Sequence, residues 1–223
     1  MGAEPLTTKP LLRPIYRKTD GTIVPAVHEV LAVLDKPWLV KWAWGLGRKG
    51  IDMDAYVGEM ADAGLLAHRM AASLFWTGDL PARRTLIEWA PAIIEKAENS
   101  ALKLMDWLQG HGVQPIAVEL GVVSEQYGYG GTLDFHGLVD GFAEIIDIKT
   151  GAGIFDEHVV QLAAYRKALE EHGYKVERVR VLSLPRGDGD GFSEHVQKDT
   201  TNEWLRFWHA LHIFRLRTAV SGK

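Results

Sequence analysis

The feature that most constrains the fold is an Asp-Gly pair, Asp140-Gly141, which lies between two apolar runs, Thr132–Leu138 and Phe142–Ile148. An Asp-Gly pair between two strand-like runs is among the strongest short-range signals for a β-hairpin, because both residues of such a turn must reach positive φ. We therefore predict an antiparallel hairpin over these residues.

The register of this hairpin gathers charged side chains on one face. Counting outward from the turn, Val139 pairs with Phe142, and Asp134 falls directly opposite Asp147. The Cβ atoms of opposed residues lie about 4.5–5.5 Å apart, so two carboxylates there repel each other unless a cation lies between them. Lys149 is two residues after Asp147 and projects to the same face. We interpret this face as a candidate metal-binding and catalytic surface.

The alternative is that Asp147 and Lys149 form an ordinary solvated ion pair, which is the more common meaning of an isolated Asp-x-Lys on a strand. Here the run Ile145–Ile148 is nearly continuous apolar sequence, as expected for a strand that is covered on both faces. An unpaired carboxylate is costly in such a place. Ile146 and Ile148 are expected to face away from the charged side chains, into a packed layer.

Three ordered motifs carry a resemblance to a known family. They are Gly-x-x-Asp at Gly131–Asp134, Asp-x-Lys-Thr-Gly at Asp147–Gly151 and Gln-x-x-x-Tyr at Gln161–Tyr165. In this order, over about residues 60 to 185, the chain resembles the RecB-like branch of the PD-(D/E)XK nuclease superfamily, especially phage-type exonucleases. The resemblance implies an α/β fold with a restriction-endonuclease-like core. Its elements follow the order helix, three strands, helix, strand, with a central mixed sheet flanked by helices and an additional helical N-terminal region.

The resemblance also implies a metal site. The segment Gly64–His68 matches the Gly-x-x-x-His that RecB-like nucleases place ahead of their carboxylates, although a lone histidine on an apolar helix face is by itself more often a core residue. His68, Asp134, Asp147 and the backbone carbonyl of Ile148 would hold Mg²⁺ or Mn²⁺. Hard oxygen ligands suit either ion, and an imidazole favours Mn²⁺.

Further site residues are expected around this metal. Glu119 lies in an apolar run on the strand before the hairpin and is a candidate ligand of a second metal or a support of the first, or else it only pairs with a nearby cation. Lys149 would orient the attacking water and stabilise charge on the phosphate. Gln161 and Tyr165 are four apart and share a helix face. Gln161 would orient Lys149, the water or a phosphate, and Tyr165 would support the strand or only pack.

Composition bounds the remaining possibilities. The 223 residues are 47% hydrophobic, and we expect one nuclease domain with an arm and helix in residues 1–52, a catalytic core in 53–185, and a loop and helix in 186–223. The absence of cysteine excludes the iron–sulfur cluster of some RecB-like proteins. No apolar run is long enough to cross a membrane and no secretory leader is evident, so we expect a soluble cytoplasmic protein of a bacterium or a phage-infected cell.

The remaining pattern predicts the secondary structure. Residues 1–25 are expected to form an extended arm, and Asp35 and Pro37 to open a helix. A second helix is expected over 53–75, with Val57, Ala61, Gly64, His68, Ala71 and Phe75 on its inward stripe. Further elements are expected as a helix from Leu86 to Leu108 despite Pro91, a strand over 115–123, a helix over 156–172 ended by Gly173, a strand over 175–184, and a final helix from Thr200 or Thr201.

The first of these helices mixes aromatic residues with cations. Trp38 and Trp42 are at helical spacing and are expected in the core, although they could instead stack bases of a single strand. Lys41, Arg48 and Lys49 are candidates for phosphate contact. The formal net charge of −4 supplies no global attraction for nucleic acid.

These observations predict a metal-dependent DNA exonuclease that acts in phage-type recombination, repair or processing. Its expected partner is DNA with a free end. An annealing protein or a helicase is a further candidate partner, because the chain has no ATP-binding motif of its own. A structure-specific endonuclease of the same fold, or a non-catalytic DNA-binding or assembly module, is the alternative.

Overall fold

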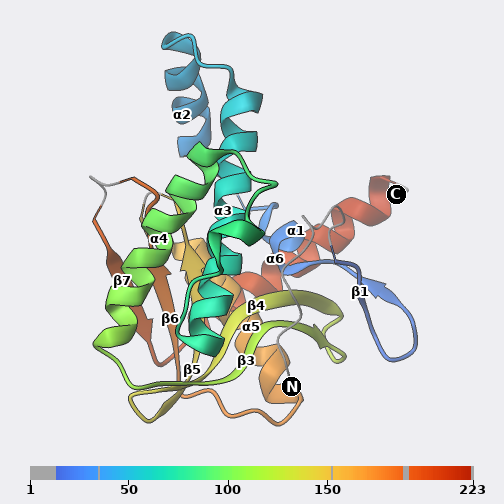
Figure 1. Cartoon of the computed structure of the whole chain (residues 1–223). Helices are drawn as coiled ribbons and strands as arrows, with labels where there is room; N and C mark the ends of the chain where they lie inside the picture. The colour runs from blue at the N-terminus through green and yellow to red at the C-terminus, as the bar shows by residue number, and fades with distance from the viewer. Residues whose placement is uncertain (1–13, 35, 152, 188–190, 222–223) are drawn as a thin grey trace.

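A five-stranded mixed sheet, in the order β3-β4-β5-β6-β7, forms the centre of the molecule (Figure 1). The structure is a computed structural model that describes residues 14–34, 36–151, 153–187 and 191–221. The strands of the sheet are β3 (Val113–Ser124), β4 (Tyr129–Val139), β5 (Phe142–Lys149), β6 (Arg178–Ser183) and β7 (Ser193–Gln197). A separate two-stranded sheet joins β1 (Tyr16–Arg17) and β2 (Ile23–Val24). The helices are α1 (Val27–Leu31), α2 (Pro37–Arg48), α3 (Met53–Thr77), η1 (Arg83–Thr85), α4 (Pro91–Gln109), α5 (Asp156–Glu171) and α6 (Thr201–Ser221).

The predicted hairpin and its register are confirmed near the turn. β4 and β5 pair antiparallel from Val139 opposite Phe142 to Phe135 opposite Ile146. Asp140 and its neighbour Gly141 have φ of 52° and 84°, as the two-residue turn requires. β5 then pairs in parallel with β6, which makes the sheet mixed. The α/β class and the mixed central sheet flanked by helices are therefore as expected.

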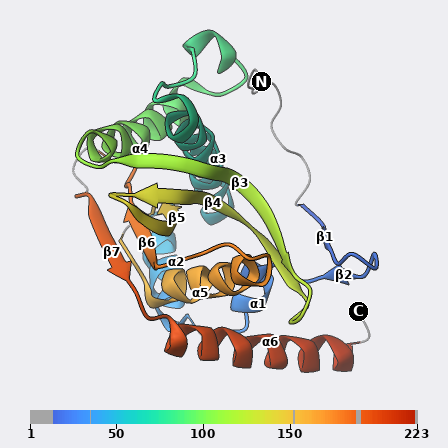
Figure 2. The same ribbon diagram turned by 90° about the horizontal axis from the view of Figure 1, so that it is seen from below.

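Two apolar layers cover the two faces of the sheet. α3 and α4 lie on one face, and α1, α5 and α6 lie on the other (Figure 2). Ile146 and Ile148 are buried in the layer of α3 and α4, whereas Ile145 is buried in the layer of α5. Since alternate residues of a strand face opposite sides, this confirms the orientation expected for the two isoleucines.

Both long strands change the face that they present to these layers. Leu133 is buried in the α5 layer and Phe135 in the α3–α4 layer, although residues two apart on a regular strand share a face. Leu120 and Val118 of β3 show the same change, and the register pairs each of them with its counterpart on β4. The two strands therefore twist together at one step.

This change of face occurs at Glu119 of β3 and at Asp134 of β4. The ladder between these strands contains the pairs on either side of them but not the two residues themselves. Glu119 has φ of 52°, a left-handed conformation that is uncommon for a side chain of this kind and that costs energy. Because of this twist, Glu119 and Asp134 lie side by side on the two strands but are not part of the strand pairing.

Three expectations about the elements are wrong in detail. α4 begins at Pro91, the first helical position that suits proline, so Leu86 and Trp89 precede the helix although both are buried. The inward stripe of α3 is shifted toward Leu66, Met70 and Leu74, because the first half of the helix projects beyond the sheet (Figure 1). Val57 is accordingly exposed. The edge strand β7 was not expected at all.

The N-terminal region differs from a simple arm. Residues 14–25 include the β1–β2 hairpin, and a short helix, α1, follows at Val27. The segment 1–13, the expected cap Asp35 and the side chain of Trp38 lie outside the described part of the structure. Trp42 is 37% exposed and contacts Tyr56 of α3, so the expectation of a core position for Trp42 is wrong. Among the described residues, no helix is long and apolar enough to cross a membrane.

Candidate active site

One group of candidate ligands joins α3 to the first two strands of the sheet. His68 comes from the middle of α3, Glu119 from the twisted step of β3 and Asp134 from β4. One ligand atom of each lies within 4.8 Å of the others. His68 Nδ1 lies 3.0 Å from Asp134 Oδ1, in an ion pair that is only partly exposed. An imidazole and two carboxylates at this spacing form a donor set for a divalent cation.

Asp134 is also fixed to the hairpin partner. Its Oδ2 accepts a hydrogen bond of 2.6 Å from the backbone amide of Ile148. The last backbone pair between β4 and β5 is Phe135 with Ile146. Beyond that pair, the Asp134 carboxylate replaces a backbone carbonyl of β4 as the acceptor for β5. Ile148 contacts Asp134 through its amide, and the metal-binding role of its carbonyl stays a prediction.

A second group lies on β5 and α5. The ammonium of Lys149 lies 2.9 and 2.7 Å from the two carboxylate oxygens of the buried Asp147. It also donates to Gln161 Oε1 at 3.0 Å, and Gln161 Nε2 donates to the hydroxyl of Tyr165 at 3.0 Å. The four side chains form one continuous chain of contacts from the sheet to the helix. The structure therefore brings together Asp147, Lys149 and the two residues of the Gln-x-x-x-Tyr motif.

Two motif glycines permit close contact between elements. A Cβ on Gly131 would lie 2.4 Å from a ring carbon of Tyr165, so only glycine lets the ring lie against β4. A Cβ on Gly64 of α3 would lie 3.3 Å from Oγ1 of Thr150, the residue after Lys149. These contacts give a physical reason for the glycine of Gly-x-x-Asp and for the glycine of Gly-x-x-x-His.

The charges in this site perturb one another. Burial tends to lower the pKa of His68, but Asp134 and, more weakly, Glu119 raise that pKa to about 9. Burial and the charge of Asp134 raise the pKa of Glu119 to about 7, although the residue as a whole is exposed. Burial also raises the pKa of Asp147 in spite of Lys149. In contrast, His68 outweighs burial and holds the pKa of Asp134 below its usual value.

These residues fit a hard divalent cation. Carboxylate oxygens are the ligands that Mg²⁺ and Mn²⁺ prefer, and one imidazole suits Mn²⁺. The buried Oδ2 of Asp147 has no hydrogen-bond partner among the described residues, although it faces the ammonium of Lys149. Unsatisfied buried carboxylate oxygens are rare without a functional reason. A nearby cation would also offset the burial and the repulsion from Asp134 that raise the pKa values of Asp147 and Glu119.

One residue beside this site was not predicted from the sequence. Three residues that were predicted to contact phosphate lie away from the site. The hydroxyl of Tyr16, on β1, lies 2.9 Å from Oγ1 of Thr132, and burial, with a smaller contribution from the charge of Glu119, raises the pKa of this hydroxyl. Nothing near Tyr16 in the sequence signals this, because the contact spans 116 positions. Lys41, Arg48 and Lys49 are on or beside α2 and make no described contact with the site residues.

Three solved structures are similar to the chain. SSO0001 aligns over 60% of this chain and 64% of its own, with 15% identity and a TM-score of 0.35. A candidate exonuclease from Eubacterium rectale aligns over 70% and 65%, with 15% identity and a TM-score of 0.49. LHK-Exo, in complex with dAMP, aligns over 89% of both chains, with 14% identity and a TM-score of 0.43. The chain thus spans just under two thirds of the first two proteins, and TM-scores below 0.5 carry no argument about its activity.

The family of the chain is shown by a match to a family model and not by these structural likenesses. No curated protein matches the sequence. The family model of the PD-(D/E)XK nuclease superfamily, however, matches residues 20–207, which is most of the chain and includes every residue of the two groups above, although not Tyr16. The expected order of the motifs and the mixed sheet agree with this match. The chain therefore belongs to the PD-(D/E)XK nuclease superfamily.

Proposed function

We propose that this nuclease is a metal-dependent deoxyribonuclease and that it acts as an exonuclease from a free DNA end. The observation that carries the proposal is the convergence of two side-chain groups from five elements. His68, Glu119 and Asp134 form the first group, and their ligand atoms lie within 4.8 Å of one another. Asp147 and Lys149 begin the second, which continues to α5.

The first group, together with Asp147, would hold Mg²⁺ or Mn²⁺. Such a cation, when bound, lowers the pKa of a coordinated water and polarises a phosphoryl oxygen. The protein's part is to fix the ligands. Asp134 is held from both sides, by His68 and by the amide of Ile148, and so is oriented before a cation arrives.

Lys149 is the proposed cationic catalytic residue. Its ammonium orients the attacking water and stabilises negative charge on the phosphate. Gln161 accepts a hydrogen bond from this ammonium, and Tyr165 contacts Gln161 in turn. Gln161 and Tyr165 are therefore positioning residues in this proposal, since they act on the substrate through Lys149. Attack in line with the leaving oxygen would give a 5′-phosphate and a 3′-hydroxyl.

The exonuclease preference rests on the likeness of His68 and the Gln161/Tyr165 motif to those of the end-dependent RecB-like group. A structure-specific endonuclease uses the same chemistry and is the second candidate. A role in phage-type recombination or repair, with an annealing protein or a helicase as partner, belongs to the same proposal.

The test is degradation of end-labelled linear and circular DNA, single- and double-stranded, in Mg²⁺, Mn²⁺ or EDTA. Wild-type protein is compared with Lys149→Ala and with Lys175→Ala. Lys175 pairs with Glu177 at the surface, so Lys175→Ala is a matched control that also removes one ammonium group. We expect metal-dependent loss of linear DNA by the wild type and by Lys175→Ala, and none by Lys149→Ala. Circular dichroism establishes that each variant is folded.

Other outcomes separate the alternatives. Cleavage of closed circular single strands supports the endonuclease. Absence of cleavage by folded wild type on every substrate contradicts the proposal and supports a non-catalytic module. Loss of Mn²⁺ affinity in Lys149→Ala, measured by calorimetry, would show that the lysine acts on the metal site and not on the water.

A further inference from the structure

The outer face of α2 carries an exposed stripe of apolar, aromatic and cationic side chains. Val40, Trp44 and Arg48 recur every four residues and so lie on one face of the helix. Val40 is 76% exposed and Trp44 is 61% exposed, whereas Leu46, on the side toward α3, is buried. The guanidinium of Arg48 lies 4.8 Å from the centre of the Trp44 ring. The indole is thus flanked by an aliphatic group and a stacked cation.

The charge of this segment is opposite to that of the chain. Residues 36–51 contain four cations, Lys36, Lys41, Arg48 and Lys49, and no acidic residue, although the whole chain has a formal net charge of −4. Lys36 pairs with Glu157, but Lys41, Arg48 and Lys49 are exposed and pair with no acidic group in the described part of the chain. The acidic residue next in sequence, Asp52, caps α3 by accepting from the amide of Ala55. α2 therefore presents a local positive surface that complements a polyanion.

The N-terminal end of α2 lies beside α5, the helix that carries Gln161. Lys36, just before α2, lies 2.8–3.0 Å from carboxylate oxygens of Glu157, which is one helical turn before Gln161 on α5. The chain then runs out along α2 and returns along α3, which carries His68 (Figure 1). Trp44 is eight residues after Lys36, which corresponds to about 12 Å along the helix.

We propose that the α2 stripe, consisting of Val40, Trp44 and Arg48 with Lys41 and Lys49 beside it, binds single-stranded DNA on its way to the active site. The inference rests on the proposed function for the identity of the polyanion. Exposed aromatic rings stack on bases of any sequence, and adjacent cations contact the phosphates. Inside a duplex the base faces are covered by neighbouring pairs and only the terminal pairs offer the ring a free face, so the stripe favours single strands. It thereby identifies a single-stranded end as the substrate of the nuclease.

The decisive measurement is the affinity for a fluorescein-labelled thymidine oligonucleotide, by anisotropy in EDTA. Trp44→Ala should weaken binding of the single strand roughly five- to 150-fold, as for the loss of one stacked base. Trp44→Phe should retain most of the affinity. Arg48→Gln should reduce the slope of log affinity against log salt by about 0.7 for one phosphate contact on a single strand.

Two controls make the result specific. Trp76→Ala removes another exposed tryptophan, 55% exposed at the far end of α3, and should leave the affinity for the oligonucleotide unchanged. A blunt duplex of the same length should bind Trp44→Ala and wild type within about twofold of each other. Equal weakening of single strand and duplex by Trp44→Ala overturns the stacking role, and an unchanged affinity for the oligonucleotide overturns the whole inference.

Hydrolysis of thymidine 5′-(p-nitrophenyl phosphate) with Mn²⁺ separates this inference from the proposed function. The ester is too small to reach from the active site to Trp44, which lies about 12 Å along α2 from Lys36, so Trp44→Ala should hydrolyse it at the wild-type rate. If wild type hydrolyses neither the ester nor DNA but loses oligonucleotide affinity with Trp44→Ala, the nuclease proposal fails and the binding surface stands. If wild type hydrolyses both and Trp44→Ala binds normally, the binding surface fails alone.

Discussion

The imidazole Nδ1 of His68 lies 3.0 Å from Oδ1 of Asp134, although 66 positions separate the two residues in sequence. The contact joins α3 to β4 across the edge of the apolar layer between them. Burial alone would lower the pKa of His68, yet the paired carboxylate raises it to about 9. A protonated His68 therefore places a positive charge directly against the carboxylate of Asp134.

His68→Gln should weaken Mn²⁺ binding by roughly tenfold or more, because the variant lacks the imidazole that favours Mn²⁺ over Mg²⁺. Calorimetric titration with Mn²⁺ and then Mg²⁺ measures this, and the loss should be larger for Mn²⁺. His195→Gln is the control, since His195 lies exposed on the opposite edge strand β7. Equal Mn²⁺ affinity in wild type and His68→Gln would exclude His68 as a ligand.

Metal affinity should rise with pH up to about 9. A metal must displace the proton of His68, whose pKa is raised to about 9, and the protons of the Glu119 and Asp147 carboxyl groups, whose pKa values burial raises to about 7 and about 6. Below these pKa values, each displaced proton lowers the apparent affinity by up to about tenfold per pH unit. Mn²⁺ titrations across neutral pH give this slope. It should be smaller in His68→Gln, and an identical slope in both proteins contradicts the assignment.

Gly131→Ala should destabilise the protein by about 1–3 kcal/mol, because the new methyl group would lie 2.4 Å from a ring carbon of Tyr165. Displacing Tyr165 also releases Gln161 and so lowers activity. Urea unfolding measures the first effect and DNA hydrolysis the second. Gly121→Ala on β3 is the control, since its Cβ meets no atom within 4 Å. In a Tyr165→Ala background the substitution Gly131→Ala should cost less stability than it does in wild type, and an equal cost in both backgrounds would show that the ring is not the obstacle.

The parts of the site that could be predicted from sequence are those with local signals. The Asp140-Gly141 turn fixed the pairing of β4 with β5, and the alternation of Asp147 and Lys149 with the isoleucines placed the charges on one face. The glycine after α5, Gly173, has φ of 80° and marks the end of that helix as expected. Each of these signals depends only on residues within one or two elements.

The rest depends on contacts that no local pattern contains. β7 reads Ser-Glu-His-Val-Gln and is largely exposed, so it lacks the apolar alternation by which strands are found. The left-handed conformation of Glu119 follows from the joint twist of two strands, and its only sequence signal was a carboxylate in an apolar run. The shifted stripe of α3 arises because that helix packs on the sheet over only its second half. Tyr16 reaches the site from the other end of the chain.

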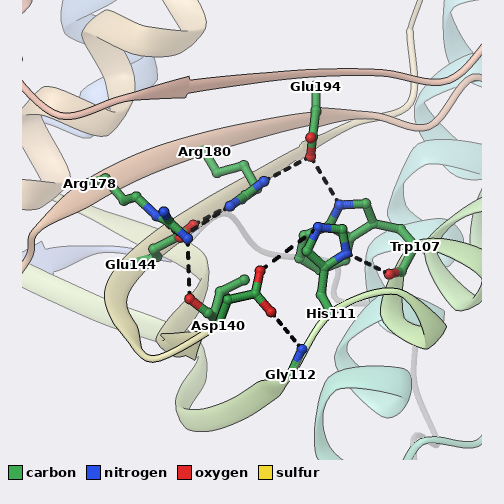
Figure 3. A network of polar contacts seen from close by, with 9 residues as sticks. Trp107, His111, Gly112, Asp140, Glu144, Arg178, Arg180 and Glu194 are labelled. Carbon is green, nitrogen blue, oxygen red and sulfur yellow. Dashed lines mark hydrogen bonds and ion pairs between the residues drawn. The ribbon is translucent and has the colours of Figure 1, made fainter.

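A buried charge network holds the last strands of the sheet together (Figure 3). Glu144 of β5 is fully buried between Arg178 and Arg180 of β6, and it accepts a hydrogen bond of 2.9 Å from Arg180. Arg180 also pairs with Glu194 of β7 at 2.8 Å, and the same carboxylate accepts from the indole of Trp107 on α4. The network thus explains how β7, despite its exposed side chains, is attached to the sheet.

Glu144→Gln should destabilise the protein by about 3–5 kcal/mol, because two guanidinium groups lose a buried counter-charge. Glu98→Gln breaks an ion pair with Arg83, whose side chain is 77% exposed, and should cost no more than about 1 kcal/mol. Urea unfolding of the two variants and of wild type measures both effects. Hydrolysis per folded molecule should be the same in all three, since Glu144 contacts none of the site residues. Similar costs for the two substitutions would contradict the role of the network.

His158 should make the protein less stable in acid. It lies in the first turn of α5, where its Nδ1 accepts a hydrogen bond from the amide of Phe155. Burial, Lys149 and Lys36 together lower its pKa to about 3. An unfolded histidine takes up a proton near pH 6.5, so between these values the unfolded chain binds more protons than the folded one. Stability from this group is therefore lost as the pH falls below about 6.5, by up to about 1.4 kcal/mol per pH unit.

The comparison of wild type with His158→Gln isolates this effect, because glutamine keeps an acceptor for the amide of Phe155 but does not titrate. Urea unfolding from neutral pH to about pH 4 should show a smaller loss of stability in the variant. Parallel curves for the two proteins would show that His158 is protonated as easily in the folded state. In a Lys149→Ala background the difference should shrink, since one of the two cations that oppose protonation is gone. That result would also place His158 electrostatically beside Lys149, the proposed catalytic residue, on the same face of α5 that carries Gln161.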